Sequence, residues 1–560
     1  MIFRPILAAA ALAGVAACAT APMQVADSAI PDVTAQPVSL DTMKTVTRTL
    51  SQDSFEGRAP GTPAGEKTVV YLTEQFAAAG LQPGNNGSWY QDVPLVEITG
   101  DNFRPLVITG GAQPLRFEPR KDWVGVSYRE VDQVDIMEAE LVFVGYGINA
   151  PEKNWNDYAG VDMTGKIAVI LVNDPDWQAE TLDGTFNGRA MTYYGRWTYK
   201  YEEAAKQGAA GALIVHQTEP ASYGWNVVES SWSGPQAYAS RSDGGASQTM
   251  MNGWVTSDAA RAIFANAGMD FDAMQAAAAQ PGFRPVEMDV SASTGFENSF
   301  RRFSSRNVIG ILPGSERPDE YVLHTAHWDH LGRCTPNEAG DDICNGAIDN
   351  ASGTAGLVAL AEAHAKAGPT ARTQVFLAVT AEESGLLGSE YYGANPVFPL
   401  DRTVGGVNMD ALMFAGASRD VSIVGPGKSE LDAYLEKALA MQGRTGTPNP
   451  NPQAGYYYRS DHFSLAKRGV PMLYVKSGDK LVDGGRAAGE AYQAAYRADA
   501  YHGPDDEYDP NWDWGGVMQD MELFYLLGRM MGESRDWPNW YAGDEFRRIR
   551  DESCAGAGGC

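Results

Sequence analysis

From about residue 300 onward, short apolar runs and longer amphipathic runs follow one another along the chain. The runs EYVLHTAHWDH, TQVFLAVTAEE and TVGGVNMDAL each begin as a strand. Between them, NASGTAGLVALAEAHAKAGP and SGLLGSEYYGAN are typical of helices, the first with a Gly-Pro stop. This alternation predicts an α/β fold, a sheet with helices on both faces.

The chain before residue 300 has a different pattern. TVVYLTEQFAAAGLQPG has the apolar spacing and terminal glycine of a helix, and FEGRAPGTPAGEK before it is turn-like. Between roughly 100 and 295, strand-like runs such as AELVFVGYGI and GKIAVILVNDP are bounded by Gly, Pro and Asn. Because this stretch carries few clustered ionisable groups, we expect it to be a separate, mostly β module.

The first residues, MIFRPILAAAALAGVAAC, are typical of an export signal. Arg4 precedes an apolar run from Ile6 to Ala17, which is too short to span a bilayer. Val15 to Cys18 resemble a bacterial lipobox, whose cysteine is acylated after cleavage; an ordinary signal cut within ACATA is the alternative. We therefore expect a signal peptide or lipobox over 1–18 and a flexible tether over 19–40. The protein would be exported, periplasmic or anchored to the outer membrane through Cys18.

Composition restricts the partners and the redox state. The 560 residues suggest two or three domains, and the net charge of −28 argues against a nucleic-acid partner. Besides Cys18, the cysteines are Cys334, Cys344, Cys554 and Cys560. In an oxidising compartment two short-range disulfides are plausible, with free thiols as the alternative.

Ionisable residues gather where the predicted strands end. His327 and Asp329 follow the first strand of this region, Asp349 opens a helix, Glu382 and Glu383 follow the next strand, Asp410 follows a third, and His502 lies in a late loop. Singly, each has an ordinary explanation, such as helix capping. Together they would repel one another unless cations neutralised them, and imidazoles with carboxylates suit zinc.

These residues, arranged as H-x-D, DN-x-SG, EE, D and H, resemble the di-zinc exopeptidase family of bacterial leucyl aminopeptidases and glutamate carboxypeptidases (peptidase family M-28). The resemblance implies a central mixed β-sheet flanked by helices and two zinc ions. It makes Asp349 the shared ligand, with His327 and Asp410 on one zinc and Glu383 and His502 on the other. Asp329 would orient the ligand imidazole. Glu382 matches the general base and Tyr501 a tyrosine that stabilises the oxyanion, although simple packing of Tyr501 is the alternative.

The resemblance covers most of the chain. FEGRAPGTPAGEK and RSDHFSLAKRGVPML match its early and late signatures, and LVFVGYGINAPEKNWNDYAGVDMTGKIAVIL resembles an inserted protease-associated domain. It implies peptidase segments over 41–99 and 296–545, the inserted mainly-β domain over 100–295 and a C-terminal tail over 546–560.

The resemblance implies a metallopeptidase acting on peptide termini, and we expect an aminopeptidase. A carboxypeptidase, a single-zinc glutaminyl cyclase and a non-catalytic receptor are the alternatives. Arg459 could bind a substrate carboxylate or simply be solvated. Of the other histidines, His324 is expected to pack inside or to cap a polar contact, and His462 to lie near the site without binding metal. His330 is expected to lie in a solvated loop, with a role in lining the site as the alternative.

Overall fold

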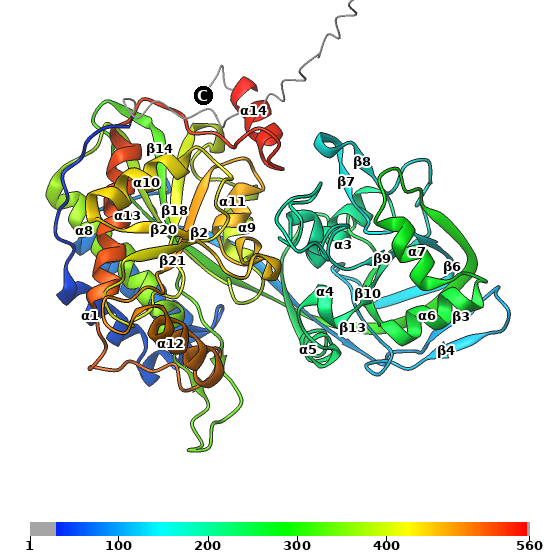
Figure 1. The fold of residues 1–560 in the computed structure, drawn as a ribbon. Helices are drawn as coiled ribbons and strands as arrows, with labels where there is room; N and C mark the ends of the chain where they lie inside the picture. Colours follow the sequence, from blue (N-terminus) through cyan, green and yellow to red (C-terminus); the bar gives the residue numbers. More distant parts are fainter. Residues whose placement is uncertain (1–29, 557–560) are drawn as a thin grey trace, which may run out of the picture.

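The computed structural model describes residues 30–556, which form two lobes side by side (Figure 1). The first lobe comprises residues 30–89 and 313–556, and the second comprises residues 102–285. Strands β2 (Tyr90–Asp101) and β13 (Val286–Leu312) join the lobes as one antiparallel ladder, from Tyr90 opposite Val308 to Asp101 opposite Glu297. The signal and lipobox expected over 1–18 lie outside the described residues.

The first lobe is built on a mixed sheet, as the sequence predicted. In spatial order its strands are β1 (Gln82–Pro83), the end of β13, β17 (Arg372–Val379), β14 (Arg317–His327), β18 (Thr403–Asn408), β21 (Met472–Ser477), β19 (Asp420–Ile423) and β20 (Thr445–Pro448). The central strands β17, β14, β18 and β21 are parallel. They are largely apolar and buried because helices cover both faces of such a sheet.

Helices surround this sheet in Figure 1. They are α1 (Leu40–Leu50), α2 (Pro63–Ala78), α8 (Gly353–Ala367), α9 (Leu387–Ala394), α10 (Leu431–Gln442), α11 (His462–Ala466), α12 (Gly485–Asp499), α13 (Gly515–Glu533) and α14 (Arg547–Gly556). The helix predicted before Gly80 is α2, which begins with a Thr62 cap and a proline in its first turn. Among the described residues, no helix is both long and apolar enough to cross a membrane.

The second lobe is not purely β. Its strands are β3 (Leu106–Thr109), β4 (Leu115–Phe117), β5 (Trp123–Val126), β6 (Gln133–Phe143), β7 (Asn149–Ala150), β8 (Trp155–Asn156), β9 (Ile167–Leu171), β10 (Gly211–His216), β11 (Pro235–Ala239) and β12 (Met251–Thr256). Its helices are α3 (Trp197–Lys206), α4 (Thr218–Ala221), α5 (Trp225–Ser231), α6 (Ser257–Asn266) and α7 (Phe271–Ala278). Strands β6, β9, β10 and β12 run parallel and need these crossovers. Its kinship to protease-associated domains stays a prediction.

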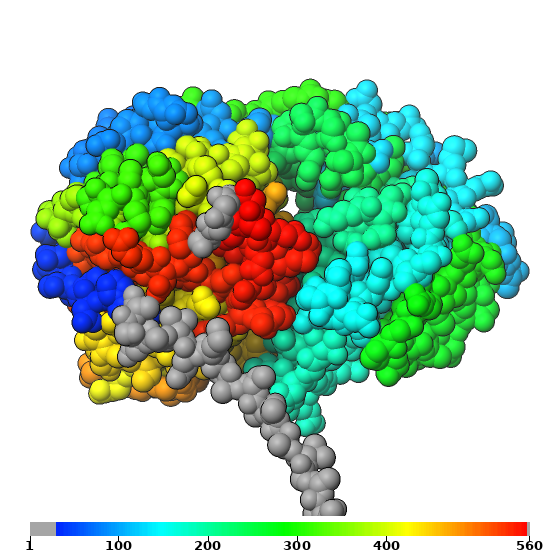
Figure 2. Space-filling model, turned by 90° about the horizontal axis from the view of Figure 1, so that it is seen from above, coloured from blue at the N-terminus to red at the C-terminus, as the bar shows by residue number. Residues whose placement is uncertain are grey.

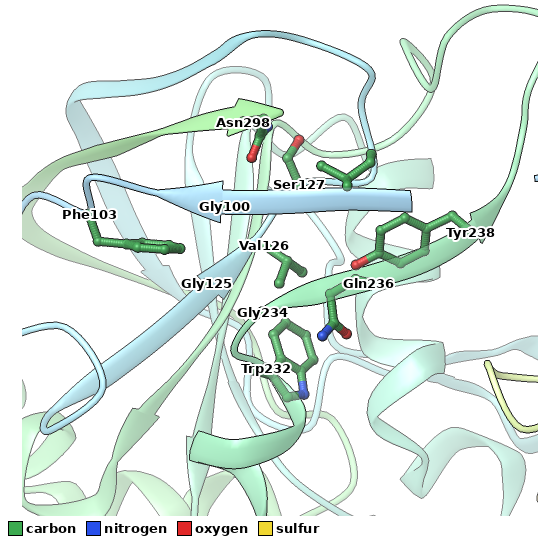
Figure 3. A pocket seen from close by; sticks show the side chains of 11 residues that line it. Gly100, Phe103, Gly125, Val126, Ser127, Trp232, Gly234, Gln236, Tyr238 and Asn298 are labelled. Atoms are coloured by element: carbon green, nitrogen blue, oxygen red, sulfur yellow. The ribbon is translucent and has the colours of Figure 1, made fainter. Parts of the chain in front are cut away.

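A small cavity where the second lobe meets β2 and β13 lies among Trp232, Tyr238 and Asn298 (Figure 3). Its volume is about 10 Å³, which is room for about one water molecule. This cavity is therefore too small for a substrate.

Both ends of the described chain pack more tightly than expected. Ile30 and Val38, within the predicted tether over 19–40, are buried in the core of the first lobe, and Lys437 donates to the carbonyl oxygen of Ile30 at 2.7 Å. Apolar side chains in this stretch therefore anchor it. Helix α14 lies in the expected tail, and Figure 2 shows this C-terminal segment (red) beside the second lobe.

One of the two expected disulfides is present. Cys334 and Cys344 are bonded, with Cα atoms 6.0 Å apart, and close a loop between β14 and α8. Cys560 lies outside the described residues, so the second expected disulfide stays a prediction.

Two buried histidines, His324 and His364, predict that the folded protein loses stability in acid. His324 stacks on Phe376, with ring centroids 4.9 Å apart, and burial lowers the pKa of His324 to about 4. Burial also lowers the pKa of His364, whose ring lies 5.2 Å from that of His324. Since an unfolded histidine titrates near 6.5, the unfolded chain binds more protons below that pH. The contribution of these neutral histidines to the free energy of unfolding is therefore fully present above pH 6.5 and is lost as the pH falls towards 4. For His324 alone, the loss at pH 5 is about 2 kcal/mol.

Neither ring nitrogen of His364 has a hydrogen-bond partner among the described residues, so His364→Leu tests this prediction cleanly. Urea unfolding at pH 7.5 and pH 5 should show a smaller loss of stability for the variant than for the parent. Equal losses would refute the contribution of His364.

Candidate metal centre

The predicted site residues follow three neighbouring parallel strands. His327 is the last residue of β14, which lies between β17 and β18. Glu382 and Glu383 come just after β17, and Asp410 comes just after β18. Because the carboxyl ends of parallel strands share one edge of a sheet, these side chains are brought to one place.

Five side chains from distant parts of the sequence converge there. Nε2 of His327 lies 3.3 Å from Oδ1 of Asp349 and 3.5 Å from Oδ1 of Asp410. Nε2 of His502 lies 3.3 Å from Oδ2 of Asp349 and 3.1 Å from Oε2 of Glu383. The two oxygens of Asp349 therefore face different imidazoles.

Asp349 is held by the backbone around it. The turn Ala347–Ser352 precedes α8, and the Asp349–Asn350 peptide bond is cis. The N–H groups of Ile348 and Asp349 donate to the carboxylate of Asp506 at 2.9 and 3.0 Å, and the Asn350 amide donates to the carbonyl oxygen of Met409 at 3.0 Å. These bonds fix the direction in which the Asp349 carboxylate points.

Asp329 lies behind His327, although its contact differs from the expected one. Nδ1 of His327 is 3.9 Å from the carboxylate of Asp329 but 3.2 Å from the carbonyl oxygen of that residue. The carboxylate instead accepts from the N–H of Glu382 at 3.2 Å. Burial raises the pKa of Asp329 to about 6. The imidazole is therefore oriented chiefly by the backbone.

His330 is buried beside the converging side chains. A solvated loop was expected, with lining of the site as the alternative, and the structure favours the alternative: His330 is 1% exposed and its Nδ1 donates to Oε1 of Glu383 at 2.6 Å. The loop after β14 packs inward, so His330 is buried beside Glu383 rather than in water. Its apolar neighbours Trp328 and Leu331 were the signal in the sequence that this loop packs inward. His324 and His462 are buried, as expected for His324.

Glu382 and Tyr501 border the converging side chains. Carboxylate and imidazole atoms of Glu382, Glu383 and His327 lie within 4.8 Å of one another, and burial raises the pKa of Glu382 well above its usual range. Tyr501 is 48% exposed, and its ring stacks on that of His502 at 3.9 Å between centroids. Tyr501 therefore lies at the open side of the cluster.

The donor set fits a metal ion. Nε2 of His327 is buried and has no hydrogen-bond partner among the described residues, although two carboxylates face it. Three sets of side chains have atoms close enough to share an ion: His327 with Asp349 and Asp410, His327 with Glu382 and Glu383, and His330 with Asp349 and Glu383. Carboxylates this close repel one another, and a bound cation would relieve that repulsion.

Residues 307–525, which contain all five converging side chains and Glu382, match the family model of Peptidase family M28. Over this segment, which is less than half of the chain, the protein is similar to Peptidase family M28. This M28 segment includes strands β14, β17, β18 and β21 but excludes the second lobe and residues 30–89.

Curated relatives match shorter stretches. Aminopeptidase NAALADL1 of Mus musculus is 31% identical over 175 residues, which are 30% of this chain and 22% of the relative. A Glutamate carboxypeptidase 2 homolog of Caenorhabditis elegans is 36% identical over 138 residues, or 24% of this chain and 16% of that protein. The chain thus spans about a fifth of these relatives' length. Among solved structures, an aminopeptidase from Aneurinibacillus sp. strain AM-1 is similar at 20% identity with a TM-score of 0.46, over 90% of this chain and 96% of that one.

Proposed function

We propose that this chain is a zinc-dependent exopeptidase with two zinc ions, and that it acts as an aminopeptidase. The proposal rests on Asp349, whose two carboxylate oxygens each lie 3.3 Å from an imidazole nitrogen, of His327 and of His502. With Asp410 beside His327 and Glu383 beside His502, the donors divide into two sets that share one carboxylate. Nitrogen and oxygen donors of these types are the ones that zinc binds in proteins.

In this proposal His327 and Asp410 would hold one zinc, Glu383 and His502 would hold the other, and Asp349 would serve both sets. Bound zinc polarises a carbonyl group and lowers the pKa of water, which is the chemistry that peptide hydrolysis needs. Glu382 takes a proton from the attacking water and returns it to the leaving amine. Tyr501, at the open side, donates its hydroxyl proton to the oxyanion as a hydrogen bond.

An aminopeptidase and a carboxypeptidase differ in the end of the peptide from which they remove residues. The curated relatives include proteins named as an aminopeptidase and as a glutamate carboxypeptidase homolog. Arg459 favours a carboxypeptidase, because its side chain is exposed and forms no ion pair with a described carboxylate, leaving it available to a substrate carboxylate. We keep the carboxypeptidase as the second candidate.

Metal analysis and a substrate panel test the proposal together. Two zinc ions per chain are expected; one would favour a glutaminyl cyclase, and none would favour a receptor. Aminoacyl and N-blocked dipeptides should then be assayed with and without a chelator. An aminopeptidase cleaves only the free-amine set and loses activity with the chelator, whereas cleavage of the blocked set identifies a carboxypeptidase.

The bond from His330 to Glu383 predicts a contribution to zinc binding. We expect His330→Leu to weaken zinc binding by about 10–100-fold, because Glu383 loses the donor that fixes its orientation. In His330→Asn the amide nitrogen can replace Nδ1, and affinity should stay closer to that of the parent. Chelator competition measures both constants, and equal affinities for the Leu variant and the parent would contradict the prediction.

We also propose that the protein is exported. The composition of residues 1–18 supports this, and so does the Cys334–Cys344 disulfide, because structural disulfides persist mainly in oxidising compartments. Fractionation of the source cells, with detection of the chain in the envelope fraction, tests it.

A further inference from the structure

A turn in the first segment, outside the M28 match, packs directly against the loop between β14 and α8. Residues Glu56, Gly57 and Arg58 all have positive φ, at 43°, 66° and 51°. A Cβ at Gly57 would lie 2.4 Å from the carbonyl oxygen of Gly332 and 2.5 Å from that of Cys344. Glycine is therefore required for the turn to come this close, and the approach buries the next side chain, Arg58.

The guanidinium of Arg58 bonds to carbonyl oxygens at both ends of that loop. Its Nε donates to Trp328 at 3.0 Å, and its terminal nitrogens donate to Asn345 at 2.6 Å and Gly346 at 2.9 Å. A fourth bond, of 2.7 Å, reaches the carbonyl oxygen of Leu50 at the end of α1. Arg58 is fully buried. A planar fork with several fixed donors suits such a set of acceptors, and lysine cannot reproduce it.

These bonded residues adjoin the metal-binding side chains. Trp328 follows His327 directly, and Gly346 lies three residues before Asp349. The bonds from Arg58 therefore hold the chain on both sides of the loop at a fixed separation. We infer that Arg58 is a positioning residue, which sets His327 and Asp349 at the spacing that a shared metal site requires. The inference rests on the zinc binding proposed above.

The charge of Arg58 adds to this positioning. Burial lowers its pKa to about 10, while Asp506 and Asp329 act to raise it, so the guanidinium stays charged at neutral pH. Its hydrogen bonds go to neutral carbonyl groups rather than to a carboxylate. The positive charge is thus free to offset the clustered carboxylates behind the site.

The experiment compares zinc dissociation constants, measured by chelator competition, for the parent and two variants of the full chain. Arg58→Met removes charge and donors and should weaken zinc binding by about 10–100-fold. Arg58→Lys keeps the charge but not the fork and should fall between the Met variant and the parent. Hydrogen exchange of the metal-free proteins should show faster exchange over residues 328–349 in both variants.

Arg550→Met is the matched control. Arg550 is 1% exposed and donates to the carbonyl oxygens of Leu400 and Thr403 at 3.1 and 2.9 Å, in contacts that involve no predicted ligand. Its loss should lower the unfolding midpoint and leave zinc affinity unchanged.

Parent-like zinc affinity in Arg58→Met would overturn the inference, and so would an equal loss in Arg550→Met. If Arg58→Met does not fold, Arg58→Lys decides, because parent-like affinity and exchange in that variant would equally overturn it. A parent that binds no zinc would instead refute the proposed function, and this inference with it.

Discussion

Glu382→Gln should bind zinc like the parent and lose about 10²–10⁴-fold in kcat, the usual contribution of a general base. The amide keeps the size of the side chain but cannot accept a proton from water. The N–H of residue 382 bonds to Asp329 through the backbone, so the substitution leaves that contact in place. Steady-state kinetics on a free-amine substrate, together with metal analysis of the same sample, give both quantities.

The zinc content of Glu382→Gln shows whether its activity is lost because the base is missing or because zinc no longer binds. A Glu382→Gln enzyme that turns over like the parent would show that Glu382 is not the base. A variant that has lost its zinc would show instead that Glu382 is a ligand, as its closeness to His327 and Glu383 would allow.

Asp349→Asn should weaken the binding of both zinc ions together. Its two carboxylate oxygens face His327 and His502 separately, so one substitution removes a charged donor from both sets. We expect a loss greater than the ~10–100-fold typical of a residue that contacts a ligand without touching the metal. Titration of the metal-free protein, followed by calorimetry, reports the number of sites and their affinities.

Asp174→Asn is the control for burying an amide in place of a carboxylate. Asp174 is fully buried in the second lobe, where it accepts hydrogen bonds from Thr192, in contacts that involve no predicted ligand. Asp174→Asn should leave the dissociation constants of both zinc ions unchanged. Loss of a single zinc in Asp349→Asn would contradict the sharing of this carboxylate.

The chain by itself determined the α/β character of the first lobe and the residues from which a metal site could be built. Apolar runs that alternate with amphipathic ones identify buried parallel strands, and residues that follow such strands meet at one edge of the sheet. This is why His327, Glu383 and Asp410 could be named before their distances were known.

Only the tertiary structure decided which neighbours hold these side chains. His330 looked like a loop residue because a sequence does not show which way a turn folds, and the fold buries it against Glu383. Arg58 lies more than 250 positions before Asn345, and their contact exists because the turn at Gly57 packs on the disulfide-closed loop. Local patterns follow from backbone geometry and burial, whereas contacts between distant segments depend on how whole elements pack, which no short stretch of sequence specifies.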